Sequence, residues 1–552
     1  MRKFKKFASM ALAAVMTLAM CAPAFAVEGS EEKTGPEYNV WQVFTGTYAD
    51  TDGGDANIKD KTLGNIHWGL NSTGYAADQA EQAAVGAEVL DVLAGKGDNT
   101  TDAIDAVKAY VNFESTPIAS GTPPFDNLED GYYLVSRKGT LGDGEAATAY
   151  VIKAIGGQLN FAEKSGVPTV DKKVNSEHTT AASIGDTLNF EITGTLPENL
   201  EYYKSYFYTF EDTMSKGLAY NDDAKVYLVR DEGERELVDQ FYVGSEPSAD
   251  GESTILTIGT QNLKDVVADL VSTDKIVVRY SATLTEDAKV GMDPNTNDVI
   301  LHYPNDPNKT AAGVPNDPEN KPEPDPETDG KTVTGEEPKT AIYVTGLTVT
   351  DFANGKPMEG AEFTLSGEGI NKKLTVATEF VEDADGLYYK LKNGTYTTQA
   401  PEETTKDQYE GSEEAGYPRY KVQLTAITEN TGEDVQKVHA TINETGALTI
   451  TGLSTGSYTL HQDSAPAGYN VHDDITFEVT FAEKTFGKTA DSSDLVIVDH
   501  NWFYINLNQG VGTLLPETGG IGTTLLYIAG ILLLAGAGAT FILKGKKEED
   551  AV

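Results

Sequence analysis

A lysine, an aspartate and two asparagines fall at inward positions of predicted strands in the middle of the chain. Strand alternation puts Lys172 on the same face as its apolar neighbours two residues away, which turns it toward a core. Asp212 shares its face with three preceding aromatic residues, and Asn297 and Asn305 share one face of the last strand of this region. Burial disfavours a charged ammonium, so a lysine placed in this way is a neutral nucleophile, and a buried carboxyl group can move protons. The alternative is an exposed ion pair between Lys172 and Asp212, worth less than about 1 kcal/mol.

The C-terminal segment combines three features in a fixed order. A pentapeptide is followed by an apolar run over 525–543 and by a lysine-rich tail over 544–552. The pentapeptide consists of Leu515, Pro516, Glu517, Thr518 and Gly519. The apolar run is just long enough for a transmembrane helix, and the lysines favour a cytoplasmic tail. At the other end, basic residues, an apolar stretch and Ala24-Phe25-Ala26 predict a signal peptide over 1–26. The precursor is therefore expected to be exported and held in the membrane.

Composition excludes several classes of function. The net charge of −44 argues against nucleic-acid binding, because phosphates demand a basic surface. The single cysteine, Cys21, lies in the signal peptide, so the mature chain has no disulfide. The seven histidines are scattered without zinc-ligand spacing, and the acidic stretch over 50–55 fits an exposed turn better than a calcium loop. We find no phosphate loop and no nucleophile elbow, and therefore expect no enzyme, no cofactor and no metal.

Length and patterning predict a mainly β chain of several domains. Mixed signals over 27–165 predict an α+β domain, with helices over 76–93 and 101–111. Short β-branched and aromatic runs over 166–306 predict an Ig-like β-sandwich, and a second sandwich is expected over 340–510. The intervening Pro-rich and acidic segment over 307–339 is typical of an extended, weakly structured linker.

Several local sequences are similar to those of one family. NFAEK at 160–164, leading into PTVDKK at 168–173, resembles the junction of the first two domains in sortase-assembled pilins of Gram-positive bacteria. YTFEDT at 208–213 and YPNDP at 303–307 look like the isopeptide-forming second domain of these fimbrial shaft subunits. APAGY at 465–469 is similar to the collagen-adhesin B-type repeat. The LPETG pentapeptide resembles their cell-wall sorting signal.

The resemblance implies a sortase substrate on the cell surface. A pilus-type sortase would cleave between Thr518 and Gly519 and pass the acyl group to a lysine of the next subunit, which by position is Lys164. The expected partners are identical subunits arranged head to tail, peptidoglycan reached through a housekeeping sortase or a base subunit, and a host or surface ligand. The runner-up function is a monomeric wall-anchored adhesin or a pilus-base subunit, which needs no receiving amine. In that case Lys164 is an ordinary charged residue of a linker.

The resemblance also implies an internal isopeptide bond that forms by itself in the second domain. We predict a bond from Lys172 to Asn305, with Asn297 as second choice and Asp212 as the assisting acid. The last domain lacks a lysine in its first strand and has Gln462 where the family has a glutamate, so no bond is predicted there. Its third member would be Asn506 or Asn508, and Asp463 should point to the opposite face.

Overall fold

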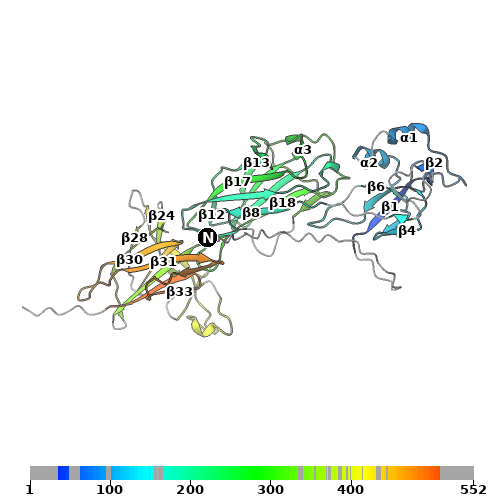
Figure 1. Ribbon diagram of the computed structural model, residues 1–552. Helices are drawn as coiled ribbons and strands as arrows, with labels where there is room; N and C mark the ends of the chain where they lie inside the picture. The colour runs from blue at the N-terminus through cyan, green and yellow to red at the C-terminus, as the bar shows by residue number, and fades with distance from the viewer. Residues whose placement is uncertain are drawn as a thin grey trace, which may run out of the picture. The chain divides into compact units, whose positions relative to one another are not determined.

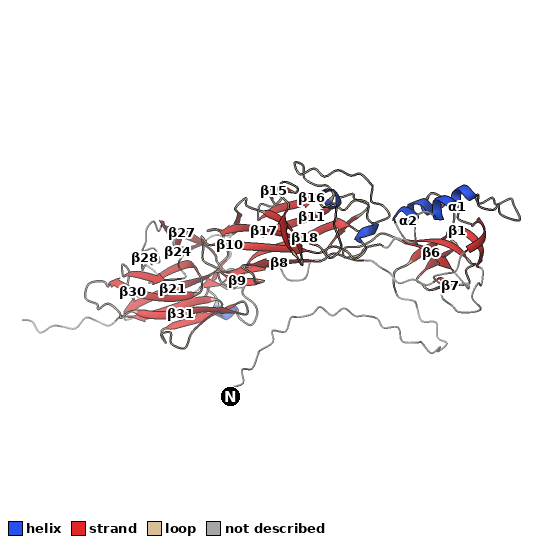
Figure 2. Ribbon diagram, turned by 45° about the horizontal axis from the view of Figure 1, so that its top comes forward, coloured by secondary structure: helices blue, strands red, loops and turns tan. Residues whose placement is uncertain are grey.

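The computed structural model describes residues 35–48, 63–94, 101–147, 150–154, 158–159, 166–332 and 340–509, the last range with short gaps between 354 and 445. The described residues divide into two compact units. The mainly β architecture predicted from the sequence is confirmed, and helices are few (Figure 2). Within the described part of the chain, no helix has the length and apolarity needed to span a membrane.

The first unit is built around one antiparallel sheet in the order β2-β1-β5-β6, with β3 on the edge of β1. The strands are β1 (Tyr38–Tyr48), β2 (Leu63–Trp68), β3 (Ala119–Gly121), β5 (Gly131–Arg137) and β6 (Tyr150–Ala154). A small two-stranded sheet pairs β4 (Phe125–Asp126) with β7 (Gln158–Leu159). Between β2 and β3 in the chain order lie the helices α1 (Ala87–Ala94) and α2 (Thr101–Lys108).

The long helix predicted over 76–93 is wrong in its first half. Only α1 is helical, because the backbone before it bonds to β2 instead of to itself. The amide of Trp68 donates to the carbonyl of Ala83, and the amide of Val85 donates to the carbonyl of Ile66. The alanine-rich periodicity of this stretch is therefore overridden by tertiary pairing.

The second unit contains two β-sandwiches (Figure 1). The two sheets of the first sandwich pack on opposite sides of one hydrophobic core, which includes several tyrosine and phenylalanine side chains. One sheet has the order β14-β13-β17-β10-β8, with β12 paired to β17. It contains β8 (Val170–Val174), β10 (Thr187–Gly194), β12 (Leu218–Tyr220), β13 (Lys225–Arg230), β14 (Gly233–Glu236) and β17 (Lys275–Leu284).

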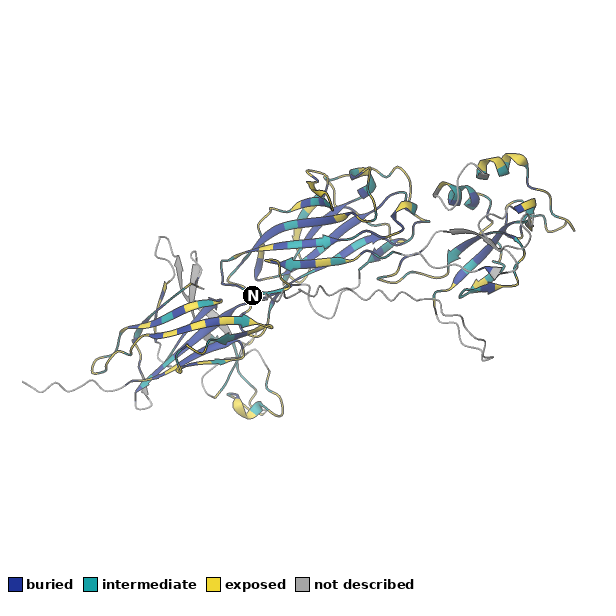
Figure 3. Ribbon diagram, viewed as in Figure 1, coloured by how far each residue is buried: buried dark blue, intermediate teal, exposed yellow. Residues whose placement is uncertain are grey.

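The facing sheet has the order β15-β16-β11-β18-β20-β9, with β19 paired to β18. It contains β9 (Thr179–Ala181), β11 (Tyr208–Ser215), β15 (Tyr242–Pro247), β16 (Ser253–Thr260), β18 (Asn295–Pro304), β19 (Asp329–Lys331) and β20 (Thr340–Tyr343), and the short helix α3 (Leu263–Val266) follows β16. Residues along β10 and β18 alternate between buried and more exposed, as a half-buried strand requires (Figure 3). This alternation is what aims the site residues inward.

The acidic segment after this sandwich is not a free spacer over its described part. Asn316 accepts a hydrogen bond from Thr260, its amide donates to Asp265, and its side-chain nitrogen donates to the carbonyl of Gln240. The strand β19 lies within the segment and pairs with β18. Side-chain capping by asparagine thus fixes a proline-rich stretch whose composition alone predicts an extended linker.

The second sandwich of this unit begins at β21, because β20 pairs with β18 of the preceding sandwich. Its larger sheet has the order β26-β25-β27-β24-β29-β21-β34-β33, with β22 paired to β21. The strands are β21 (Thr345–Ala353), β22 (Lys356–Pro357), β24 (Leu374–Glu382), β25 (Tyr388–Lys390), β26 (Tyr396–Thr397), β27 (Arg419–Glu429), β29 (Ala447–Leu453), β33 (Val496–Asp499) and β34 (Trp502–Asn508).

The smaller sheet has the order β28-β23-β30-β31-β32 and contains β23 (Glu362–Gly367), β28 (Lys437–Thr441), β30 (Gly456–Ser464), β31 (Ile475–Ala482) and β32 (Thr485–Lys488). The first strand, β21, runs parallel to the last long strand, β34. The core between the two sheets is apolar, with buried polar residues at a few positions.

Candidate functional site

The site is centred on Lys172, which lies on the edge strand β8 and is fully buried. As alternation predicts, Lys172 points inward and Lys173 does not. The Nζ atom of Lys172 lies 5.4 Å from the ring centroid of Phe190 and 5.6 Å from that of Tyr280, and these two rings stack on each other. The lysine therefore ends in an aromatic pocket closed to solvent.

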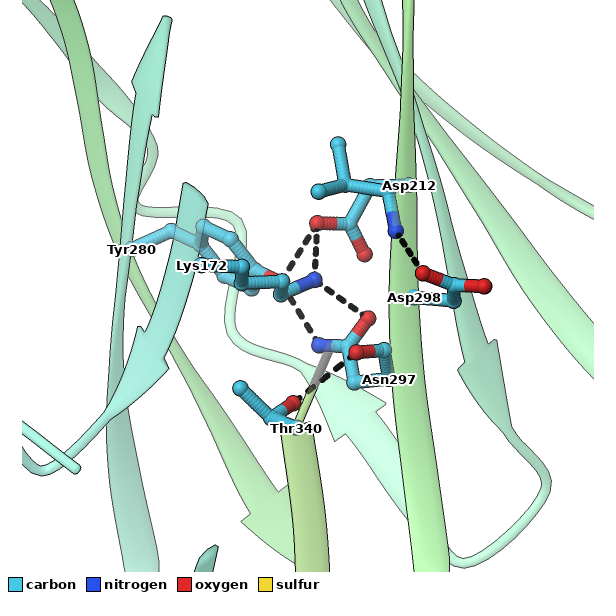
Figure 4. Close-up of polar contacts among 7 residues, drawn as sticks. Lys172, Asp212, Tyr280, Asn297, Asp298 and Thr340 are labelled. Atoms are coloured by element: carbon cyan, nitrogen blue, oxygen red, sulfur yellow. Dashed lines mark hydrogen bonds and ion pairs between the residues drawn. The ribbon is translucent and has the colours of Figure 1, made fainter. Parts of the chain in front are cut away.

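Two oxygen atoms meet this nitrogen. Lys172 Nζ contacts Asp212 Oδ2 in a buried ion pair and donates to Asn297 Oδ1 at 2.5 Å (Figure 4). Asp212 comes from β11 and Asn297 from β18, neighbouring strands of the facing sheet, and both side chains are fully buried. Register pairs Asp212 with Val299 and Met214 with Asn297, so the two side chains lie one step apart along the same sheet face. The nitrogen of one sheet thus faces a carboxyl group and an amide of the other.

Tyr280 joins the acid to the amide. Its hydroxyl donates to Asp212 Oδ2 at 2.9 Å and accepts from Asn297 Nδ2 at 2.7 Å (Figure 4). These two bonds orient the asparagine so that its oxygen faces Lys172 and its nitrogen faces Tyr280. Thr340 of β20 donates to the backbone carbonyl of Asn297 at 2.9 Å and fixes the strand at this point.

Sequence reasoning missed both Tyr280 and Thr340. The signal for Tyr280 was present, because it is the polar-tipped member of an otherwise aliphatic inward face on β17, whose other members are Ile276, Val278, Ala282 and Leu284. The signal for Thr340 was not, because it depends on β20 returning to pair with β18.

Burial favours the neutral forms of Lys172 and Asp212, and the attraction between the two groups opposes it. Burial lowers the pKa of Lys172 to about 8, against the opposing attraction of Asp212. Burial raises the pKa of Asp212, although Lys172 and Tyr280 both act to lower it. Burial therefore favours transfer of a proton from the amine to the carboxyl group, which leaves a neutral amine beside the Asn297 carbonyl.

The structure places Asn297, the second choice for the partner of Lys172, against the lysine, and not Asn305, the first choice. Both asparagines are buried and have the same strand parity, so alternation could not separate them. Eight residues of extended chain span about 26 Å, so only one of them can reach Lys172. Asn305 lies past the end of β18, where its amide donates to the carbonyl of Thr328.

The corresponding position of the last sandwich holds different residues. Gln462 is buried, and Asp463 points to the other face as predicted, where it accepts a hydrogen bond from Thr364. Asn506 and Asn508 are exposed and do not enter the core. The inward positions are filled by Asp351 of β21, Gln462 of β30 and Gln509 just after β34, which contact one another.

Other predicted sites lie outside the described residues. These are the signal peptide over 1–26, Lys164, the pentapeptide from Leu515 to Gly519, the apolar run over 525–543 and its basic tail. Within the described ranges, no group of three or more histidine, cysteine or acidic side chains is arranged to hold a metal ion.

Two family models match the C-terminal part of the chain. The model of the SpaA prealbumin-like fold domain matches residues 420–493, and the model of the LPXTG cell wall anchor motif matches residues 508–550. A curated relative, the trypsin-resistant surface T6 protein of Streptococcus pyogenes serotype M6, is 24% identical over 408 residues, which is 71% of each chain.

Two solved structures are similar to the chain over most of its length. The T6 backbone pilin of serotype M6 Streptococcus pyogenes is 14% identical, with a TM-score of 0.44 and coverage of 85% of this chain and 86% of that chain. The full-length major pilin SpaD from Corynebacterium diphtheriae is 13% identical, with a TM-score of 0.40 and coverage of 87% of this chain and 93% of that chain.

The match to the anchor motif shows that the C-terminal segment is a cell wall anchor, and the mature protein belongs on the cell surface.

Proposed function

We infer that the chain is a sortase-assembled pilin of a Gram-positive bacterium, a structural subunit of a surface pilus attached to the cell wall. The observation that carries this function is the cell wall anchor motif over 508–550. It ends a chain that is similar to a surface protein over 71% of this chain and 71% of that protein. Similarity of that extent involves the β domains and not the anchor alone. The tandem sandwiches suit a load-bearing subunit, since they place buried strands between the two ends of the chain.

Polymerisation would use two residues that are far apart in one chain. The thiol of a pilus-type sortase breaks the bond between Thr518 and Gly519 and holds Thr518 as a thioester. The neutral amine of Lys164 in the next subunit then attacks this carbonyl, an amide forms, and the thiol is released. An exposed lysine is mostly protonated near neutral pH, so the sortase must accept its proton.

Replacing Lys164 with alanine is expected to abolish the covalent polymer, because the receiving amine is lost. Boiled cell-wall extracts of the native host, run on a denaturing gel and probed for this chain, should show a high-mass ladder for the wild type. The Lys164→Ala extract should show only the anchored monomer. The matched control is Lys138→Ala, which removes an exposed lysine paired with Glu37 and should leave the ladder intact.

An unchanged ladder in Lys164→Ala would disprove the assignment of this lysine. Wild-type chain that migrates as a single band would instead favour the runner-up function, a monomeric wall-anchored adhesin or a pilus-base subunit. Loss of both the ladder and the anchored monomer would point to failed export. An anchored monomer without a ladder shows that the variant is exported and that polymerisation alone has failed.

We also propose that the first sandwich of the second unit forms an internal amide between Lys172 and Asn297. The neutral amine attacks the Asn297 carbonyl, the new bond joins Nζ to Cγ, and the bond from Cγ to Nδ2 breaks. The proton that the amine gives up reaches Nδ2 through Asp212 and Tyr280, and ammonia leaves. The contact of Tyr280 with Nδ2 supports this route. Water is excluded from the pocket, which disfavours hydrolysis of the product.

Intact mass should locate this bond. The mature wild-type chain is expected to weigh about 17 Da less than its sequence predicts, the mass of one ammonia lost in the condensation. The deficit should disappear in Asn297→Ala and in Lys172→Ala. It should persist in Asn305→Ala, which serves as the matched control because Asn305 is also buried and on the same strand face. A deficit that disappears in Asn305→Ala and persists in Asn297→Ala would reverse the pairing.

A further inference from the structure

Three polar side chains meet in the core of the last sandwich, where a cross-link would join the first strand to the last. Asp351 is fully buried on β21, and Gln462 and Gln509 are buried beside it. Gln509 Nε2 donates to Asp351 Oδ2 at 2.8 Å and to Gln462 Oε1 at 3.1 Å. The amide of His472 also donates to Gln462 Oε1, at 2.7 Å. Both protons of Gln509 Nε2 are therefore used in hydrogen bonds.

Two oxygen atoms of this cluster are left over. Asp351 Oδ1 and Gln509 Oε1 are buried and have no hydrogen-bond partner among the described residues. Both groups are planar, and they are already joined through Oδ2 and Nε2. A carboxyl group and an amide joined in this way can form a second, parallel hydrogen bond if one proton lies between the remaining oxygens. An ionised carboxylate cannot supply that proton, because it only accepts.

We propose that Asp351 is a protonated carboxylic acid in the folded protein and forms a paired hydrogen bond with the side-chain amide of Gln509. Its Oδ1 hydroxyl donates to Gln509 Oε1, and its Oδ2 accepts from Gln509 Nε2. This pair satisfies both buried oxygens with one proton. It fastens the first strand of the last sandwich to the residue that follows its last strand.

The surroundings of Asp351 agree with a retained proton. Burial raises the pKa of Asp351, and the hydrogen bond from Gln509 and the nearby His472 act in the opposite direction. In the described part of the chain, His472, in the loop after β30, is the titratable side chain that acts on this carboxyl group. Among the described side chains, no lysine or arginine is a cause of this shift in the pKa of Asp351, so none of them compensates an ionised Asp351 with a full positive charge.

The position of the pair matters for a chain under tension. The amide of Gln509 also donates to the carbonyl of Phe352 at 2.7 Å, next to Asp351. Gln509 precedes the anchor pentapeptide by a few residues, so force applied at that end enters the sandwich here. Because β21 and β34 are parallel, such force shears one strand along the other, and the pair lies at the end where shear begins. Neither the sortase reaction nor the internal amide is needed for this pair.

The test compares whole mature chains that carry Asp351→Asn or Asp351→Ala. Asparagine has the shape and the hydrogen-bonding pattern of the protonated acid, so its melting temperature for the last sandwich should stay close to that of the wild type near pH 5. Alanine leaves the Gln509 amide unpaired and should lower the melting temperature by about 3 to 10 °C.

The pH dependence gives the sign of the effect. The folded pKa of Asp351 is raised, so its contribution to stability is complete below the unfolded value of about 4 and declines as the pH rises toward the folded pKa. The wild-type melting temperature minus that of Asp351→Asn should therefore fall as the pH rises above about 4. The trend should persist in a His472→Gln background, which removes the neighbouring titratable group.

Infrared difference spectra give a direct readout of the proton. At about pH 5.5, where ordinary carboxyl groups are ionised, wild type minus Asp351→Asn should contain a protonated-carboxyl band. The matched control Asp463→Asn removes an exposed carboxyl group from β30 of the facing sheet and should give no such band and a flat temperature difference. A flat difference for Asp351→Asn, or no lost band, would overturn the proposal in favour of an ionised Asp351 whose oxygens are satisfied by water.

Discussion

Lys172→Ala is expected to lower the melting temperature of the first sandwich of the second unit by about 10 to 20 °C. Lys172 and Asn297 are 125 residues apart in sequence, so an amide between them closes almost the whole sandwich into one loop. In the chain-entropy description of a cross-link, a loop of this size stabilises the fold by about 5 kcal/mol. For a domain of this size, each kcal/mol corresponds to about 2 to 4 °C in melting temperature.

Differential scanning calorimetry of the mature chain measures this shift. Lys173→Ala is the matched control, because it lies on the same strand, is not buried and takes no part in the site. Its melting temperature should stay within about 2 °C of the wild type, as surface substitutions usually do. Asn297→Ala keeps the lysine but also prevents the bond, so it should lose a similar amount as Lys172→Ala. A small loss in both variants would mean that the chain is not cross-linked before the substitution.

The strand pattern of the sequence carried most of the information about this site. Alternation alone aims Lys172, Asp212 and Asn297 into one core, because each strand has one buried face. What it cannot supply is the position along the face, which depends on how β8 of one sheet crosses β18 of the other. Asn305 has the same strand parity as Asn297 but lies too far along the chain from Lys172, and only the packing of the two sheets distinguishes the two asparagines.

The residues that sequence reasoning missed share one property, which is that their role depends on long-range pairing. Tyr280 matters because it touches two side chains from the opposite sheet. Asp351 matters because the segment after β34 returns to it through Gln509. The family resemblance directed attention to Asn506 and Asn508, which are exposed, whereas the buried polar cluster uses Gln509, the next residue along the chain.

The two sandwiches of the second unit would solve one mechanical problem with different chemistry. In the first, an amine and an amide meet an acid in an aromatic pocket and can condense. In the second, a carboxyl group stands on the first strand and two glutamine amides face it, so no nucleophile is present among these three residues and only hydrogen bonds can form. We therefore expect the second sandwich to open and close reversibly, whereas a cross-linked first sandwich cannot extend beyond its closed loop.

Asp212→Asn is expected to slow the formation of the internal amide by about 100-fold to 10,000-fold, the usual contribution of general acid–base catalysis. Asparagine has the size of aspartate but cannot take the proton of Lys172 or return it to the leaving nitrogen. The amine of Lys172 would still be driven toward its neutral form by burial, so the nucleophile remains while proton transfer fails. Intact mass of chain made by cell-free synthesis, sampled over time, follows the loss of ammonia.

Tyr280→Phe tests the second half of the proton route in the same experiment. It keeps the aromatic ring against Phe190 and removes only the hydroxyl that joins Asp212 to Asn297 Nδ2. Bond formation should slow, but by less than in Asp212→Asn, because the acid remains beside the amine. Tyr208→Phe is the matched control, since it removes a buried hydroxyl that donates to the carbonyl of Thr195 in the same sandwich. If Tyr208→Phe slows the reaction as much as Tyr280→Phe does, the effect of Tyr280 is on folding, and if Asp212→Asn reacts at the wild-type rate, the carboxyl group is not the acid.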